Sequence, residues 1–148
     1  MISLLAIHTE FPSVVFLFYP NQKIILSKTI LVVDDCEITR EMISLLLEEY
    51  EPEPEVVTGE SGKDGLDKLA NNEIDLILSD VMMPEMDGYE FVAEVRKLPE
   101  HANIPVNMLT DLSEIKDMQK GKAAGANAWL KKPVERDRMY ELLDKHLG

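Results

Sequence analysis

Apolar residues follow two alternating patterns along the chain from residue 29 onward. Short continuous apolar runs are typical of strands buried on both faces, and between them apolar residues recur every three or four positions, as on one face of a helix. The runs predict five strands, at Thr29–Val33, Glu55–Thr58, Ile74–Ser79, Pro105–Thr110 and Asn127–Leu130. Because five strands alternate with five helices, we expect an α/β fold with a doubly wound five-stranded parallel sheet.

Each predicted helix has an apolar face, and some helices have signals at their ends. The apolar positions at helical spacing are Ile38, Met42, Leu45 and Leu46; Leu66 and Leu69; Phe91, Val92 and Val95; Ile115, Met118 and Ala123; and Met139, Leu142, Leu143 and Leu147. Ser61 is a candidate N-cap of the second helix, and Gly125 is a candidate stop for the fourth. We expect the third helix to follow Asp87 and Gly88.

The first residues of the chain differ from the rest. They are apolar, but His8 and Pro12 interrupt them and no basic residue precedes Lys23, which makes a poor signal peptide. The stretch either folds as a hairpin or does not belong to the native protein, in which case translation begins near residue 26 or 27. We therefore divide the chain into an N-terminal extension of open status, 1–28, and one predicted domain, 29–148.

Composition narrows the classes of partner. Of the 148 residues, 28 are acidic and 15 are basic, which gives a net charge of −13. This excess disfavours nucleic acid and anionic membrane surfaces, and it suits a protein partner or a bound cation. The single cysteine, Cys36, excludes an internal disulfide and fits the reducing cytoplasm. No apolar run reaches the about 20 residues that a membrane helix needs, so we expect no membrane insertion.

Polar residues gather where the predicted strands end. The first strand is followed by Asp34 and Asp35, the third by Asp80, and the fourth ends at Thr110, while Lys132 follows the fifth. Ligands of open parallel sheets bind outside the carboxyl ends of the strands. We therefore expect these side chains to meet at one rim of the sheet.

The types of residue at this rim suggest phosphoryl chemistry. Carboxylates packed together repel each other unless a cation is present, and Mg²⁺ prefers a few carboxylate oxygens. A lysine ammonium can neutralise a phosphoryl oxygen, and a hydroxyl can donate to it. We expect the three histidines, His8, His101 and His146, to lie on the surface, so the set lacks a nucleophile paired with histidine. It is suited to a carboxylate that accepts a phosphoryl group.

The chain resembles the receiver domain of two-component response regulators. The paired acids at 34–35, the stretch DVMMPEMDG at 80–88, Thr110 after an apolar strand and the Lys132-Pro133 pair match that family in order and spacing. The tract KGKAAGANAWLKKP is similar to that of stand-alone regulators of the CheY-like kind. The resemblance covers residues 29–148 and implies the flavodoxin-like fold of that family.

The resemblance also implies a role for each matched residue. Asp80 is the phosphoryl acceptor. Asp35 binds Mg²⁺ directly and Asp34 supports it through water. Lys132, with a cis peptide bond to the following proline, pairs with a phosphoryl oxygen.

Two more positions complete the metal site and the switch that the family implies. The backbone carbonyl of Met82 completes the metal ligands, so the expected metal set is Asp34, Asp35, Asp80 and Met82. Thr110 turns toward the phosphoryl group, and Trp129 occupies the aromatic switch position. The plain alternatives are a core tryptophan, an ordinary strand threonine and a solvated lysine at 132.

The function implied by this resemblance is signalling rather than metabolic catalysis. A sensor histidine kinase would phosphorylate the acceptor, and output would come from binding an effector protein, such as a flagellar motor switch, through a surface that includes Ile115, Met118 and Lys122. Chemotaxis or motility is the first expectation, and a phosphorelay intermediate is the second. No nucleic-acid partner is expected.

Two residues depart from the family pattern and leave alternatives open. Asp111 replaces a residue that is commonly small, so it either repels phosphate or turns to solvent, and a binding module that cannot be phosphorylated stays possible. Met82 has no polar group to place an attacking water, which predicts slow loss of phosphate. A phosphatase of the haloacid-dehalogenase type needs an acid at this position, so Met82 disfavours that enzyme class.

Overall fold

The computed structural model describes residues 26–111 and 118–148. Its strands are β1 (Thr29–Val33), β2 (Glu55–Gly59), β3 (Leu76–Asp80), β4 (Val106–Thr110) and β5 (Ala128–Lys131). Its helices are α1 (Glu37–Glu48), α2 (Gly62–Asn71), α3 (Gly88–Lys97), the short 3₁₀ helix η1 (Pro99–His101), α4 (Met118–Ala124) and α5 (Arg136–Leu147). Each of the five expected strands is present, with ends displaced by no more than two residues.

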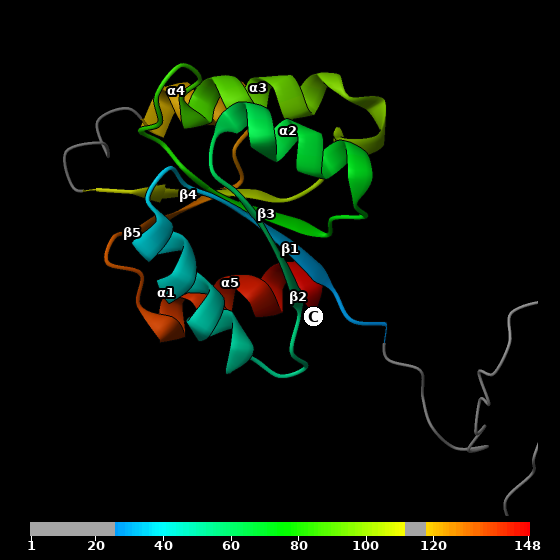
Figure 1. The fold of residues 1–148 in the computed structure, drawn as a ribbon, viewed down its shortest axis with the longest axis vertical. Helices are drawn as coiled ribbons and strands as arrows, with labels where there is room; N and C mark the ends of the chain where they lie inside the picture. Colours follow the sequence, from blue (N-terminus) through cyan, green and yellow to red (C-terminus); the bar gives the residue numbers. More distant parts are fainter. Residues whose placement is uncertain (1–25, 112–117) are drawn as a thin grey trace, which may run out of the picture.

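The five strands form one parallel sheet in the order β2-β1-β3-β4-β5. Helices α1 and α5 cover one face of the sheet and α2, α3 and α4 cover the other (Figure 1). The order reverses direction at β1, because β2 lies on one side of it and β3 on the other. This is the doubly wound, flavodoxin-like arrangement, in which ligands bind where the strand order reverses.

Two apolar clusters lie on the two faces of the sheet. The larger side chains of the α1–α5 face are Ile43 and Leu47 from α1 and Met139, Leu142 and Leu143 from α5. On the other face, Phe91, Val92 and Val95 of α3 pack with Leu69 of α2. Strand residues alternate between the two clusters, so the continuous apolar runs supply both. The core is therefore built as the sequence pattern predicts.

The expected apolar face of α1 is correct only in part, because Leu46 packs against the core but the other three residues are exposed. The buried residues of this helix are Ile43 and Leu47, whereas Ile38, Met42 and Leu45 are 67%, 54% and 60% exposed. The helix has two apolar stripes with the same spacing, and only the inner one packs on the sheet. Hydrophobic periodicity alone cannot tell which stripe faces inward.

Several expected helix ends are confirmed. The Ser61 hydroxyl accepts a hydrogen bond of 3.1 Å from the backbone N–H of Asp64 at the start of α2. Asp87 and Glu90 form a reciprocal capping box at the start of α3. Gly125, at φ +104°, follows the last residue of α4 in a conformation that favours glycine.

One buried polar residue has no counterpart among the expectations. Asn107 of β4 is fully buried, and its side-chain amide has no hydrogen-bond partner in the described part of the chain. It pairs in register with Leu78 and Ala128, which lie on the α1–α5 face. An apolar residue would fit this position better by packing rules.

Some expectations fall outside the described residues or need correction. The N-terminal extension up to residue 25, His8 within it, and Ile115 lie outside the described ranges. His101 and His146 are half-buried rather than on the surface, and burial lowers the pKa of His146, with a further effect from neighbouring Lys145. Within residues 26–111 and 118–148, every helix is too short or too polar to span a bilayer.

Candidate functional site

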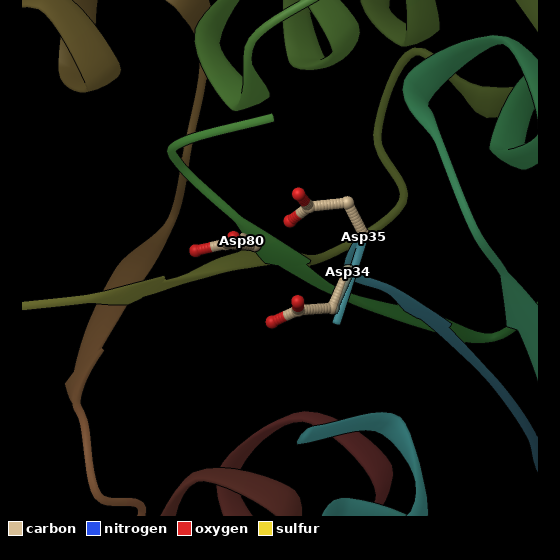
Figure 2. Close-up of side chains that lie close together, drawn as sticks. All are labelled: Asp34, Asp35 and Asp80. Carbon is tan, nitrogen blue, oxygen red and sulfur yellow. The ribbon is translucent and has the colours of Figure 1, made fainter. Parts of the chain in front are cut away.

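Three acidic side chains meet at the carboxyl end of the sheet. Asp34 and Asp35 follow directly after β1, and Asp80 is the last residue of the neighbouring strand β3. Figure 2 shows their carboxylates extending toward the same space beyond the strand ends. Asp34 and Asp80 are buried, whereas Asp35 is exposed. The structure therefore brings together the acids that the sequence placed at one rim.

The spacing of these carboxylates fits a hard divalent cation. One ligand oxygen from each acid lies within 4.8 Å of the others. Mg²⁺ has ligands at about 2.0–2.1 Å in octahedral geometry, so oxygens on one ion are separated by up to about 4 Å. Small side-chain movements would bring Asp35 and Asp80 onto one ion with Asp34 close enough to reach it through water, and the exposed side at Asp35 leaves room for water ligands.

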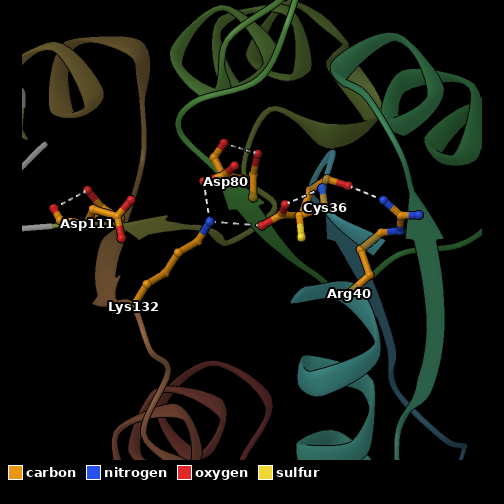
Figure 3. A network of polar contacts seen from close by, with 8 residues as sticks. Cys36, Arg40, Asp80, Asp111 and Lys132 are labelled. Atoms are coloured by element: carbon orange, nitrogen blue, oxygen red, sulfur yellow. Dashed lines mark hydrogen bonds and ion pairs between the residues drawn. The ribbon is translucent and has the colours of Figure 1, made fainter. Parts of the chain in front are cut away.

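Lys132 supplies the positive charge of the cluster. Its Nζ lies 2.7 Å from Asp80 Oδ1 and 3.1 Å from Asp34 Oδ2, and the side chain is 20% exposed (Figure 3). Burial disfavours the charged amine, but the hydrogen bonds and negative charges of the two acids outweigh it and raise the pKa of Lys132. The peptide bond to Pro133 is cis, as predicted. One ammonium thus bridges two of the three clustered carboxylates.

A tight turn holds the acids that follow β1. The Asp34 carboxylate accepts a hydrogen bond of 2.8 Å from the backbone N–H of Cys36. The Arg40 guanidinium donates a bond of 2.6 Å to the Asp34 carbonyl. Cys36 is free and exposed, and hydrogen bonds with Thr39 lower the pKa of its thiol. The contact from Arg40 was missed by sequence reasoning, although a basic residue one turn into the helix after two acids is a usable signal.

The loop after β3 passes close to the end of that strand, which carries Asp80. Gly88 N–H donates a bond of 2.7 Å to the Val81 carbonyl. A Cβ at Gly88 would collide with the Asp80 carbonyl, so only glycine allows this close approach. Met82 is 66% exposed, and its side chain offers no polar group to the site. The backbone of Met82 is therefore its only possible contribution to a metal site.

Thr110 and Asp111 lie at the end of β4, next to the strand that carries Asp80. The buried Thr110 hydroxyl donates a bond of 3.1 Å to the Asp111 carbonyl (Figure 3). Asp111 is exposed, and it lines a groove of about 260 Å³ together with Lys132. Asp111 thus lies on the same side of the molecule as Lys132 rather than remote from the acidic cluster.

Trp129 packs away from the acids, against the α3–α4 side. It is half-buried, and a Cβ added to Gly121 of α4 would lie 2.8 Å from both its ring and the ring of Tyr89. Its indole N–H is buried and has no hydrogen-bond partner among residues 26–111 and 118–148. Packing alone holds the ring in place, and the buried N–H without a partner costs some free energy, which disfavours this position of the ring.

Known proteins resemble the chain in both sequence and structure. The family model of the response regulator receiver domain matches residues 30–144. An uncharacterized 14.6 kDa protein of Leptolyngbya boryana is 36% identical over 118 residues, which are 79% of this chain and 88% of the relative. Protein PilG of Pseudomonas aeruginosa is 29% identical over 118 residues, 80% of this chain and 86% of its own length.

Other relatives are much longer or have solved structures. The transcriptional regulatory protein GlrR of Escherichia coli is 39% identical over 92 residues, which are 62% of this chain but only 20% of GlrR. The chemotaxis protein CheY4 of Vibrio cholerae superimposes with a TM-score of 0.75 at 36% identity, covering 82% of this chain and 99% of CheY4. With the family match over residues 30–144, these likenesses show that the chain belongs to the response regulator receiver domain family of two-component signalling proteins.

Proposed function

We propose that the chain is a response regulator that accepts a phosphoryl group on Asp80 and signals by binding another protein. The observation that carries this proposal is the position of Lys132, whose ammonium bridges Asp80 and Asp34 at 2.7 and 3.1 Å. A carboxylate oxygen of Asp80 would bond to phosphorus as the phosphorus–nitrogen bond of a phosphohistidine breaks and the imidazole leaves. Lys132 would neutralise the charge on the phosphoryl oxygens.

The acids of the site would hold Mg²⁺. The proposed ligands are Asp35 and Asp80, the backbone carbonyl of Met82, and Asp34 through water. When bound, the ion would supply charge neutralisation for the incoming phosphoryl group and would relieve the repulsion among the three carboxylates.

A sensor histidine kinase is the proposed phosphoryl donor, and the outer stripe of α1 is its proposed docking surface. Ile38, Met42 and Leu45 are more than half exposed. Met42 also lines the groove that leads to Lys132. A donor helix laid along this stripe would bury apolar surface and place its phosphohistidine near Asp80.

The output surface is proposed on α4, β5 and α5. Thr110 would turn from the Asp111 carbonyl toward the phosphoryl group, and Trp129 would follow into the space this movement opens. Met118 and Lys122 of α4 would then contact an effector protein. The likeness to CheY4, a chemotaxis protein, favours a role in chemotaxis or motility, and a phosphorelay intermediate is the second candidate.

Phosphorylation with a small donor tests the function. Incubation with Mg²⁺ and acetyl phosphate should give an adduct of one phosphoryl group, visible by intact mass. Asp80→Asn should abolish it, and Asp67→Asn, an exposed acid of α2, should not. Turnover without an adduct would indicate a phosphatase, and no reaction would indicate a binding module silenced by Asp111.

A further inference from the structure

Arg40 is the only arginine of the first helix, and its guanidinium points back to the turn that carries the acids. Its Nη1 donates a hydrogen bond of 2.6 Å to the backbone carbonyl of Asp34 (Figure 3). Arg40 is half-buried, and it lies on α1 four residues after Cys36. A short bond from a charged donor is stronger than a neutral one. This contact therefore constrains the peptide that joins Asp34 to Asp35.

The rest of Asp34 is held as firmly as its carbonyl. Its backbone N–H donates a hydrogen bond of 3.1 Å to the Gly59 carbonyl. Its carboxylate accepts from the Cys36 N–H through Oδ1 and contacts Lys132 through Oδ2. Asp35 is different, because its exposed carboxylate has no hydrogen bond or ion pair with any residue of 26–111 and 118–148. The direction of the Asp35 side chain thus depends on the backbone that precedes it.

We infer that Arg40 is a positioning residue for the cation site, which it serves through the Asp34–Asp35 peptide. By holding the Asp34 carbonyl, the guanidinium fixes the plane of this peptide and so the direction in which the Cα–Cβ bond of Asp35 leaves the backbone. Without the contact, the peptide can rotate and the Asp35 carboxylate leaves the cluster. Groups that orient the ligands of a metal commonly have a strong influence on the affinity for that metal. The inference rests on the proposed binding of Mg²⁺ by these acids.

A purely electrostatic role for Arg40 predicts the opposite effect. A positive guanidinium close to the three acids repels an incoming cation, so its removal would strengthen Mg²⁺ binding. Loss of positioning would weaken binding. The sign of the change therefore separates the two roles.

Calorimetric titration with Mg²⁺ alone tests the inference. Arg40→Met should raise the dissociation constant about tenfold. Arg40→Lys keeps the charge and part of the reach, and it should recover part of the affinity. Arg138→Met is the matched control, because this exposed arginine pairs with Glu141 at 3.2 Å, away from the acids, and its loss changes the net charge equally. It should leave affinity within about twofold, the range of a screened surface charge.

A second measurement separates positioning from folding and from chemistry. In Arg40→Met, a higher Mg²⁺ concentration should be needed for half of the maximal rate of phosphorylation by acetyl phosphate. At saturating Mg²⁺ the rate should equal that of the wild type. Urea unfolding in EDTA, without Mg²⁺, shows whether Arg40→Met is destabilised. If it is, Arg40→Gln is used in its place. Unchanged or tighter Mg²⁺ binding in the Arg40 variants overturns the inference about Arg40 but leaves the proposed metal site standing. Failure of the wild-type protein to bind Mg²⁺ overturns the proposed metal site and the inference with it.

Discussion

At the carboxyl end of the sheet one ammonium group contacts two carboxylates and a third lies nearby, whereas at the amino end one guanidinium is surrounded by neutral oxygens. Arg96, near the end of α3, donates to the Ile104 carbonyl at 2.6 Å, to the Gly125 carbonyl at 2.8 Å and to Asn127 Oδ1 at 2.9 Å. Burial lowers the pKa of Arg96. These bonds tie α3 to the segments that lead into β4 and β5.

The two cations differ in how far each satisfies the groups around it. The planar fork of Arg96 satisfies several carbonyls at once, and its neighbours need no further ligand. Lys132 is a point charge that leaves most of the carboxylate charge uncompensated. The hydrogen bonds of the Arg96 guanidinium are therefore satisfied by the chain itself, whereas the carboxyl end keeps an excess of negative charge that a bound cation would offset. Substitutions at the two ends should accordingly differ in kind.

The largest expected effect comes from Lys132→Met. Loss of the ammonium should slow phosphorylation by acetyl phosphate about 100-fold, because one preorganised group that stabilises developing charge is worth that much. Unfolding in EDTA should become easier, since the carboxylates of Asp34 and Asp80 lose the ammonium that both contact, and Mg²⁺ should restore part of the stability.

The neighbouring Lys131→Met is the matched control for this prediction. Lys131 is exposed, and its loss changes the net charge equally. It should leave both the rate and the stability near wild type. An equal effect of the two variants would mean that net charge, not the position of Lys132, governs the site.

The next largest effect is expected at the other end of the sheet. Arg96→Met should lower the free energy of unfolding by about 2–3 kcal/mol, because several hydrogen bonds from a charged donor are lost and partly buried carbonyls lose their donor. The loss should be the same with and without Mg²⁺, and phosphorylation should persist in the folded fraction. A Mg²⁺-dependent loss in urea titrations would show that the two ends are coupled.

A smaller effect is expected at Met82, on the exposed side of the site. Met82→Asn would add an amide able to orient the attacking water, and one such hydrogen bond is worth about 1 kcal/mol, or about fivefold in rate. The half-life of the phosphorylated protein, followed by intact mass after the donor is removed, should shorten by this factor. An unchanged half-life would show that water at this site is placed by other groups.

The smallest effect is a change with pH at Tyr50, at the amino end. Burial, the hydrogen bond of 2.7 Å to Asp144 and the charge of Asp144 raise the pKa of Tyr50 to about 12. The unfolded phenol titrates near pH 10, so the stability that the protonated form contributes is complete below pH 10 and declines as the pH rises toward 12. In urea unfolding, Tyr50→Phe should lose less stability than wild type over this interval. Parallel curves for the two proteins would contradict the assignment.

The strands and the cluster at their carboxyl ends were predictable from the sequence. Continuous apolar runs identify strands that are buried on both faces, and parallel connection brings their last residues to one rim, so Asp34, Asp80 and Lys132 could be expected to meet. Their contacts of 2.7 and 3.1 Å agree with that expectation. The roles of Thr110 and Trp129 stay predictions, because they concern a movement.

Other features depend on three-dimensional information that no local pattern contains. Ile38 and Met42 have the same spacing as Ile43 and Leu47, so periodicity does not show which stripe of α1 faces the sheet. The bond from Arg40 to the Asp34 carbonyl depends on how the helix leaves the turn. Nothing in the sequence near Asn107 indicates that its amide is buried without a partner.

The two apolar stripes of α1 separate the demands of folding from those of recognition. Ile43 and Leu47 cannot change without loss of core packing, whereas substitutions at exposed positions usually alter stability by less than about 0.5 kcal/mol. After gene duplication, Ile38, Met42 and Leu45 can therefore diverge while the fold persists. If donors dock on this stripe, sister regulators in one cell can become insulated from each other's kinases through a few surface substitutions.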